Sequence, residues 1–328
     1  MNSNQQGIFV KDKMRVVITD YGFPDVTIER ELVGAAGGNL AAFHCKTEQE
    51  LIDAVRDADA LLVQFAPITR PVIESLTRCK TIVRYGVGVD NIDLDAARSR
   101  GIAVCNVPDY CVNEVADHTF AMALALTRQL TAVDAQMRRG VWLRTPPRPM
   151  PASRQMTFVT IGFGRIARAV LDRARACQFN VATCDSLLSA DAEILGSVRN
   201  LSLNQALAAA DVLSLHVPLT VDTRHLINAH TLALLRPGSI LINTARGGLV
   251  DSLALAEALS KAQLAGAGLD VFEEEPLPPG HPLLKCPNVL LTSHLAWCSQ
   301  ASGLELQRLA AEEVVRVLRG QPAHSQVA

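Results

Sequence analysis

The sequence predicts an α/β fold with two doubly wound parallel-sheet domains. From residue 16 onward, short apolar runs typical of strands alternate with segments of helical periodicity, which favours parallel strands joined by helices on both faces of a sheet. With 328 residues, of which 49% are hydrophobic and 20% charged, the chain is long enough to bury two cores. A glycine stretch that follows an apolar run near the middle of the chain indicates where the second domain begins.

The first domain is expected to contain five strands with helices between them. The strands are predicted at Val16 to Thr19, Leu40 to His44, Ala60 to Gln64, Thr81 to Tyr85 and Ile102 to Asn106. One long helix is predicted from Asn113 to Arg139. The segment after it, Val141 to Arg154, is rich in proline and arginine and is expected to be an irregular connection.

The second domain is expected to alternate strands and helices in the same way. Its strands are predicted at Met156 to Ile161, Asn180 to Cys184, Val212 to Leu215, Ile240 to Asn243, Gly266 to Leu269 and Val289 to Leu291. A final helix is predicted from Gly303 to Leu318, with Gly320 in the position of its C-terminal cap.

The glycine stretch Gly162-Phe163-Gly164-Arg165-Ile166-Ala167 lies between a predicted strand and a helical pattern from Arg165 to Cys177. A dinucleotide-binding turn has this context: the first glycine permits the tight turn and the second lets the main chain approach a pyrophosphate. A small residue, here Ala167, then permits close packing of helix and strand. An ordinary turn with small residues is the alternative.

The end of the next strand favours the nucleotide interpretation. Asp185 follows the glycines by about 20 residues, where a carboxylate would accept hydrogen bonds from ribose hydroxyls. A carboxylate would repel a 2′-phosphate, and no Arg or Lys follows until Arg199. The sequence therefore favours NAD over NADP as the cofactor.

Polar residues at other strand ends are candidates for a substrate site, because ligands of open parallel sheets bind at the carboxyl ends of the strands. Arg246 follows one strand beside two glycines, and its guanidinium suits the carboxylate and carbonyl of a 2-keto acid. His294 ends another strand, Asp270 ends a third, and Glu275 precedes Pro276. Taken singly, each has an ordinary alternative, such as a surface salt bridge, a structural histidine or a solvated acidic loop.

Composition argues against several other classes of protein. The net charge is −2 and Lys and Arg are dispersed, so no nucleic-acid surface is expected. No apolar run approaches bilayer length, and the polar start, Met1 to Lys13, does not resemble a signal peptide. Eight single cysteines without a C-x-x-C pair, and no histidine cluster, predict reduced thiols and no metal site. We therefore expect a cytoplasmic protein that binds no membrane.

The chain resembles the D-isomer-specific 2-hydroxyacid dehydrogenase family over nearly its whole length. Besides the motifs above, four segments carry the resemblance: Tyr85-Gly-Val-Gly-Val-Asp-Asn-Ile-Asp93, Asn106-Val-Pro-Asp-Tyr110, Asn113-Glu-Val-Ala-Asp-His118 and Ala311-Glu-Glu-Val-Val315. The resemblance implies a Rossmann coenzyme domain, residues 108–298, inserted into a flavodoxin-like substrate domain, residues 1–107 and 299–328. It also implies a homodimer joined through the coenzyme domain.

The resemblance assigns roles to individual residues. Arg246 would bind the substrate carboxylate and carbonyl, Glu275 would pair with the catalytic His294, and Asp270 would hold the nicotinamide carboxamide. Main-chain amides around Val87 and Gly88 would grip the carboxylate. Cofactor contacts are expected from Gly162, Phe163, Gly164, Arg165, Ile166, Asp185, His216, Pro218, Thr244 and Ala245.

The implied reaction interconverts a 2-keto acid and a D-2-hydroxy acid by hydride transfer. In reduction, protonated His294 would give its proton to the developing alkoxide, while Arg246 stabilises the negative charge. Glu275 beside the imidazole is expected to favour the charged form. The sequence leaves the particular 2-keto acid open.

Two further residues resemble the C-terminal-binding-protein branch of this family. Arg84 could supply a second cation at the substrate carboxylate, and Trp297 could form a wall of the pocket. Because that branch includes corepressors, the alternative function is an NAD(H)-sensing protein-binding module with little or no turnover. The absence of long polar tails and of a basic patch in the sequence favours the enzyme.

Overall fold

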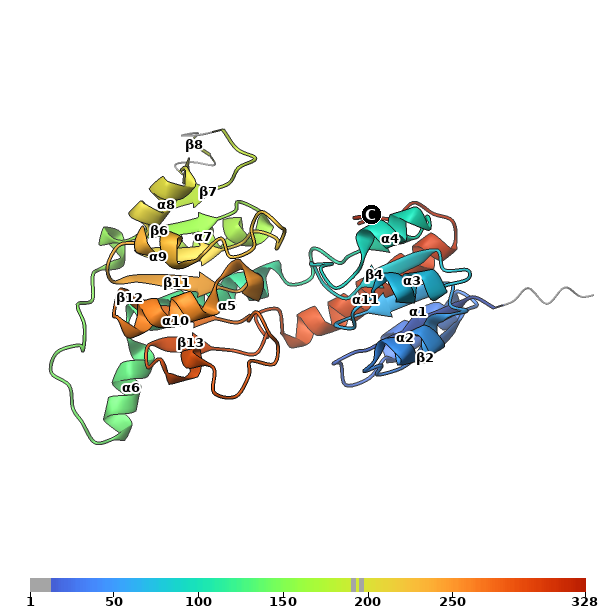
Figure 1. The fold of residues 1–328 in the computed structure, drawn as a ribbon, viewed down its shortest axis with the longest axis horizontal. Coiled ribbons are helices and arrows are strands. Elements are labelled where there is room, and N and C mark those ends of the chain that lie inside the picture. The colour runs from blue at the N-terminus through green and yellow to red at the C-terminus, as the bar shows by residue number, and fades with distance from the viewer. Residues whose placement is uncertain (1–12, 190–192, 195–197) are drawn as a thin grey trace, which may run out of the picture. The chain divides into compact units, whose positions relative to one another are not determined.

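The chain folds into two units, each built on a sheet of mainly parallel strands (Figure 1). The computed structural model describes residues 13–189, 193–194 and 198–328. One unit extends to Tyr110 and resumes from Ser299 to Ala328, and the other comprises Cys111–Cys298. The junctions expected from the sequence lie after residues 107 and 298. Apart from Lys13, the expected polar start of the chain lies outside the described residues.

The first unit has a five-stranded parallel sheet in the order β2-β1-β3-β4-β5. Its strands are β1 (Arg15–Ile18), β2 (Asn39–Ala42), β3 (Ala60–Val63), β4 (Thr81–Arg84) and β5 (Ala103–Cys105). This strand order is that of flavodoxin-like folds, in which the connections change direction next to β1. The five predicted strands are therefore confirmed, with ends that differ by at most two residues.

Helices cover both faces of this sheet. They are α1 (Thr27–Ala35), α2 (Glu48–Val55), α3 (Arg70–Ser75), α4 (Leu94–Ser99) and α11 (Gln300–Leu318). Apolar residues of α2, α3 and α4 form one core with alternate strand residues. On the other face, α11 packs over β3 and β4, and α1 packs against α11 and β2. The last helix begins three residues before the predicted Gly303, because Ser299 and Ser302 form a capping box at its start.

The second unit has an eight-stranded sheet in the order β13-β12-β11-β10-β6-β7-β9-β8. Its strands are β6 (Thr157–Ile161), β7 (Asn180–Cys184), β8 (Glu193–Ile194), β9 (Val198–Asn200), β10 (Val212–Leu215), β11 (Ser239–Asn243), β12 (Leu264–Leu269) and β13 (Val289–Leu291). From β9 to β12 the order is that of a Rossmann fold, with its switch point beside β6. The prediction of two doubly wound domains is confirmed.

The edge of this sheet departs from the prediction of purely parallel strands. β8 pairs with β9 in the antiparallel sense, whereas the other pairs described in this sheet are parallel. Neither β8 nor β9 was predicted, because two such short segments that also carry the polar residues Glu193, Arg199 and Asn200 do not form an apolar run.

The core of the second unit lies on both faces of its sheet. Within β6, Val159 and Ile161 belong to one apolar cluster and Phe158 to the other, as the alternation of side chains along a strand requires. The helices are α5 (Val112–Thr127), α6 (Leu130–Arg138), α7 (Arg165–Ala176), α8 (Leu203–Ala209), α9 (Ala229–Ala233) and α10 (Ser252–Ser260). α5 and α7 cover one face, and α8, α9 and α10 cover the other.

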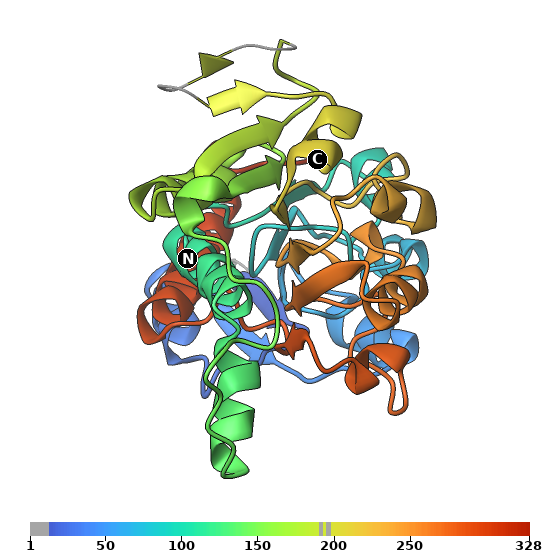
Figure 2. The ribbon, with the colours of Figure 1, turned by 90° about the vertical axis from the view of Figure 1, so that its left-hand side faces the viewer.

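The single long helix predicted from Asn113 to Arg139 is wrong, since the chain forms two helices there. Gln129 lies between them with φ of +53°, in the left-handed region. Its side chain donates a hydrogen bond to the carbonyl of Arg148 (2.8 Å) and accepts one from the amide of Arg148 (3.2 Å). This contact with a distant segment ends α5, and Figures 1 and 2 show α6 projecting from the rest of its unit.

Within the residues that the structure describes, no helix combines the length and apolar character needed to cross a bilayer.

Candidate active site

The turn between β6 and α7 requires its first glycine. Gly162 has φ of +97°, and a Cβ there would lie 2.6 Å from the carbonyl oxygen of His216. Gly164 precedes α7, and among the residues described no side chain caps the start of that helix. The amides of the first turn, from Arg165 and Ile166 onward, therefore face a space that suits an anion. This geometry fits a pyrophosphate.

Asp185 follows the carboxyl end of β7, next to the glycine turn. Its Oδ2 accepts a hydrogen bond from the amide of Phe163 (2.8 Å), and its Oδ1 accepts one from the amide of Leu187 (2.9 Å). The carboxylate and the glycine turn thus lie side by side, as a nucleotide whose ribose is bound by an acidic residue would require.

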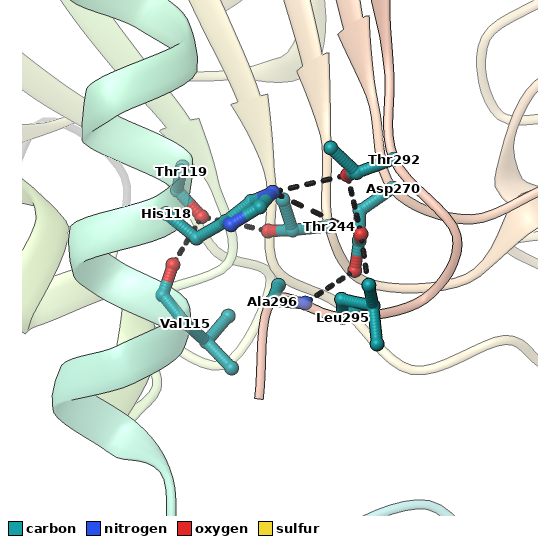
Figure 3. Close-up of polar contacts among 8 residues, drawn as sticks. All are labelled: Val115, His118, Thr119, Thr244, Asp270, Thr292, Leu295 and Ala296. Atoms are coloured by element: carbon teal, nitrogen blue, oxygen red, sulfur yellow. Dashed lines mark hydrogen bonds and ion pairs between the residues drawn. The ribbon is translucent and has the colours of Figure 1, made fainter. Parts of the chain in front are cut away.

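The other expected cofactor residues lie at the ends of β10 and β11. Burial lowers the pKa of His216 to about 3, and its Nε2 lies 2.8 Å from the Ser214 hydroxyl, so the ring is neutral near pH 7. Pro218 is exposed two residues further on. Ala245 is half-buried, while the hydroxyl of Thr244 faces α5 and lies 2.7 Å from that of Thr119 (Figure 3). A nucleotide would therefore meet the main chain of Thr244 rather than its hydroxyl.

Arg246 lies on a loop that packs closely against another loop of the same unit. Asn243 at the end of β11 donates to the carbonyl of Arg246 (2.8 Å), and Arg246 Nη1 donates to the carbonyl of Ala245 (2.7 Å). A Cβ at Gly247 would overlap the carbonyl group of Phe272 and lie 2.5 Å from the amide nitrogen of Glu273. Only glycine permits this approach, which brings the loop of Arg246 onto the loop that carries Glu275.

Glu275 and His294 form a hydrogen-bonded pair. Nδ1 of His294 lies 2.7 Å from Oε2 of Glu275, and the other carboxylate oxygen accepts from the amide of Phe272 (3.0 Å). Partial burial raises the pKa of Glu275, but the hydrogen bond and charge of His294, the Phe272 amide and the charge of Arg246 outweigh it and lower that pKa. Because a carboxylate only accepts, Nδ1 carries the hydrogen and Nε2 is the ring nitrogen that can exchange a proton with a substrate.

The main chain at His294 is held in a strained conformation. His294 has φ of +56°, a region that costs a non-glycine residue about 1–2 kcal/mol. Asp270 balances this cost: its carbonyl accepts from the His294 amide (2.7 Å), and its carboxylate accepts from the amides of Leu295 and Ala296 (2.9 Å each). The Thr292 hydroxyl donates a further, short hydrogen bond of 2.5 Å to this carboxylate. Figure 3 shows the three hydrogen bonds that the carboxylate accepts.

Asp270 is therefore a structural support of the histidine loop as well as a candidate cofactor ligand. Its side chain is only 1% exposed. Three of the roughly four acceptor positions of a carboxylate are taken by protein groups that the structure describes. The position that remains could accept one hydrogen bond from a carboxamide. Trp297 follows in the same turn and is half-buried.

The candidate substrate residues Arg84, Val87 and Gly88 belong to the first unit. Arg84 ends β4, and Val87 and Gly88 follow it in a loop. The side chain of Asn106 donates to the carbonyl of Val87 (2.7 Å), which fixes the loop from the neighbouring strand. Below the loop, the hydroxyl of Tyr85 donates to the fully buried carboxylate of Glu29 (2.7 Å).

Sequence reasoning missed the support behind the histidine loop. His118 of α5 lies 3.0 Å from the hydroxyl of Thr292, and Thr119 pairs with Thr244. The available signal was weak, since His118 and Thr119 directly precede the apolar second half of α5, and no local pattern points to their threonine partners.

The second unit thus combines an anion-binding turn, a nearby carboxylate, a guanidinium and an imidazole paired with a carboxylate. An imidazole held in this way can exchange a proton with an oxygen that gains negative charge, and a guanidinium can stabilise that charge. Within the described ranges, no group of three or more His, Cys, Asp or Glu side chains is arranged to hold a metal ion.

Comparison with known proteins gives a consistent result. The family model for the D-isomer specific 2-hydroxyacid dehydrogenase NAD binding domain matches residues 120–296. The D-3-phosphoglycerate dehydrogenase of Methanocaldococcus jannaschii is 39% identical over 283 residues, 86% of this chain and 54% of that protein. The chain thus spans about half the length of that relative. The glyoxylate reductase of Korarchaeum cryptofilum is 37% identical over 280 residues, 84% of each chain.

A solved structure supports the same assignment. The D-lactate dehydrogenase of Aquifex aeolicus, complexed with NAD and lactic acid, has a TM-score of 0.85 at 29% identity, covering 93% of this chain and 96% of that one. The resemblance found in the sequence is confirmed, and the chain belongs to the D-isomer specific 2-hydroxyacid dehydrogenase family.

Proposed function

We propose that this protein interconverts a small 2-keto acid and the corresponding D-2-hydroxy acid with NAD as the cofactor. The observation that carries the proposal is the His294–Glu275 pair, 2.7 Å apart and within the electrostatic influence of Arg246, in a domain of the NAD-binding type. This combination suits proton transfer to a carbonyl oxygen next to a carboxylate.

The cofactor would be held by the glycine turn and the strand ends around it. The amides at 163–166 would bind the pyrophosphate, and Asp185 the ribose, exchanging part of its present hydrogen bonding to Phe163. His216, Pro218, Thr244, Ala245 and Asp270 would contact the nicotinamide half. NADH, when bound, supplies the hydride that adds to the keto carbon.

The protein's own residues would perform the remaining steps. Arg246 binds the carboxylate and the carbonyl oxygen of the keto acid, which orients the carbonyl and stabilises the charge that develops on it. His294 gives its Nε2 proton to that oxygen, and Glu275 stabilises the imidazolium beforehand. In the direction of oxidation, Nε2 removes the hydroxyl proton instead.

From the resemblance, we also propose that Arg84 and the amides of Val87 and Gly88 bind the substrate carboxylate, and that Trp297 limits the size of the substrate. The alternative of an NAD(H)-sensing binding module is not favoured, since the relatives described above are named as dehydrogenases and a reductase.

The test is the loss of NADH absorbance with a panel of 2-keto acids graded by side-chain size and charge, with NADPH in parallel. We expect turnover with at least one acid, preference for NADH, and a product that chiral chromatography identifies as the D-enantiomer. Bound NADH without turnover across the panel would instead support the binding module.

We further propose a cytoplasmic homodimer. The segment formed by α6 and the residues after it exposes four large apolar side chains, and exposed apolar side chains that gather on one segment favour an interface. They are Leu130, Met137, Val141 and Trp142, the last 77% exposed. Sedimentation equilibrium of the wild type and of Trp142→Ser tests the assembly: a dimer weakened by the substitution is expected, and a wild-type monomer would contradict the proposal.

A further inference from the structure

Two consecutive residues of α5 contact the two loops that carry the candidate catalytic groups. The hydroxyl of Thr119 lies 2.7 Å from that of Thr244, two residues before Arg246. Nε2 of His118 lies 3.0 Å from the hydroxyl of Thr292, two residues before His294. Figure 3 shows both contacts extending from the helix toward Thr244 and Thr292, which follow β11 and β13 on either side of β12.

The hydrogen atoms of the contact between His118 and Thr292 can be assigned from the groups around it. Thr292 donates to Oδ1 of Asp270 at 2.5 Å, and a hydroxyl has only one hydrogen to give. Toward His118 it can therefore only accept, so Nε2 of His118 carries a hydrogen. His118 thus fixes the rotation of the Thr292 hydroxyl, which points at Asp270 as a result.

The hydrogen atoms of the contact between Thr119 and Thr244 can be assigned in the same way. Thr119 donates its hydrogen to the carbonyl of Val115 (2.6 Å), so its oxygen accepts from Thr244. Both Thr119 and Thr244 are at most 9% exposed, and a polar group buried in this way is held strongly to its partner. The end of β11 is thereby tied to α5 immediately before the loop of Arg246.

The contact between His118 and Thr292 is linked through Asp270 to the catalytic histidine. The carboxylate that Thr292 orients accepts the amides of Leu295 and Ala296, and these amides follow the strained residue His294. His118 also lies 3.8 Å from the same carboxylate oxygen. A change at His118 is therefore transmitted through two side chains to the main chain at His294.

We propose that His118 and Thr119 are positioning residues, which set the spacing between the substrate anchor Arg246 and the proton donor His294. The proposal rests on the proposed function, since it concerns the geometry of the same reaction. α5 is a suitable reference because it packs along α7, β11 and β12 with an apolar face. Neither residue touches the reacting atoms in this scheme, and each acts through a threonine.

Loss of the His118–Thr292 contact and loss of the Thr119–Thr244 contact are expected to cause different kinetic defects. His118→Leu removes the donor to Thr292, so we expect kcat to fall about threefold to tenfold, the effect of one lost hydrogen bond, with KM within twofold of wild type. Thr119→Val keeps the shape and removes the acceptor for Thr244, so we expect KM for the keto acid to rise about threefold to tenfold. His118→Gln, whose Nε2 can take the place of the ring nitrogen, and Thr119→Ser should restore wild-type values.

A spectroscopic readout separates this proposal from the proposed function. Long-range ¹H–¹⁵N spectra record the ring signals of the histidines. The signals of His294 are identified as those that disappear in His294→Asn. We expect them to move or broaden in His118→Leu and to stay in place in His118→Gln, whether or not a substrate has been found. If His118→Leu does not fold, Thr292→Val tests the same contact, with Thr292→Ser as its control.

The proposal would be overturned if His118→Leu had the kinetics of the wild type, or if His118→Leu and Thr119→Val showed the same kinetic defect. So would failure of His118→Gln and Thr119→Ser to restore activity. If the wild type binds NADH but reduces no keto acid, the proposed function fails, and the His294 signals alone then decide whether His118 positions that ring.

Discussion

Gly247 lies directly against the carbonyl group of Phe272, with no room for a side chain between them. This approach joins the loop of Arg246 to the loop of Glu275, although the two follow different strands. Main-chain packing thus brings the loop of a guanidinium onto the loop of a carboxylate, and the charge of Arg246 helps to lower the pKa of Glu275, which pairs with the imidazole.

Gly247→Ala is therefore expected to impair catalysis. A Cβ would push the Arg246 loop away from the Phe272 carbonyl, and displacement of an oriented anchor costs at least about tenfold in kcat/KM. Gly248→Ala is the matched control, because its Cβ would meet side-chain ends and no main chain, with Leu219 at 2.9 Å and Arg224 at 3.7 Å. Steady-state kinetics of both variants check this expectation, and equal kcat/KM values would contradict it.

Glu275→Gln is expected to narrow the pH range of reduction. The pKa of Glu275 is lowered below its ordinary value of 4.5, so its carboxylate and the pairing with His294 persist above that pH. The stabilisation is present above pH 4.5 and is lost as the pH falls through the lowered folded value. Glutamine cannot stabilise an imidazolium by charge, so the rate should fall at a lower pH on the alkaline side than in the wild type. Superimposable pH profiles would argue against the pair.

Asp185→Asn is expected to weaken the preference for NADH over NADPH. An amide oxygen can still accept from the Phe163 amide, so the turn is preserved while the charge that repels a 2′-phosphate is removed. The ratio of kcat/KM for the two cofactors should fall about tenfold. An unchanged ratio would mean that another residue sets the choice of cofactor.

His216→Gln is expected to make the protein less sensitive to acid. Burial lowers the pKa of His216 from 6.5 to about 3 in the folded state. Between these values the unfolded chain binds one more proton, so this histidine reduces stability as the pH falls below 6.5. Glutamine keeps a partner for Ser214 and cannot be charged.

The melting temperature measured at neutral pH and at mildly acidic pH tests this expectation. Its fall on acidification should be smaller in His216→Gln than in the wild type. The exposed His230 provides the control: His230→Gln should show the wild-type fall. An equal fall in both variants would contradict the assignment.

The parts that were predicted correctly are those that depend on short stretches of sequence. A glycine pair after an apolar strand specifies a turn without help from distant residues, as Gly162 shows with φ of +97°. Arg246 and His294 were expected to follow strands, where parallel sheets bind ligands, and they do follow β11 and β13. Their catalytic roles stay predictions.

The parts that were missed depend on residues far apart in the chain. The break at Gln129 is held by Arg148, 19 residues later, and the support of the histidine loop joins His118 to Thr292, 174 residues later. A single sequence contains no local pattern for such contacts. The second role of Asp270, in holding the amides at 294–296, emerges only when the strand ends are seen together.

The central claim, that His294 delivers the proton in hydride transfer, is tested most directly by single-turnover reduction of a 2-keto acid with NADH already bound. His294→Asn is the variant of choice, because asparagine tolerates the left-handed backbone found at this position and the loop can keep its shape. We predict unchanged NADH affinity and a rate about 10²–10⁴-fold below that of the wild type. A variant that binds NADH and reduces the acid at the wild-type rate would contradict the account.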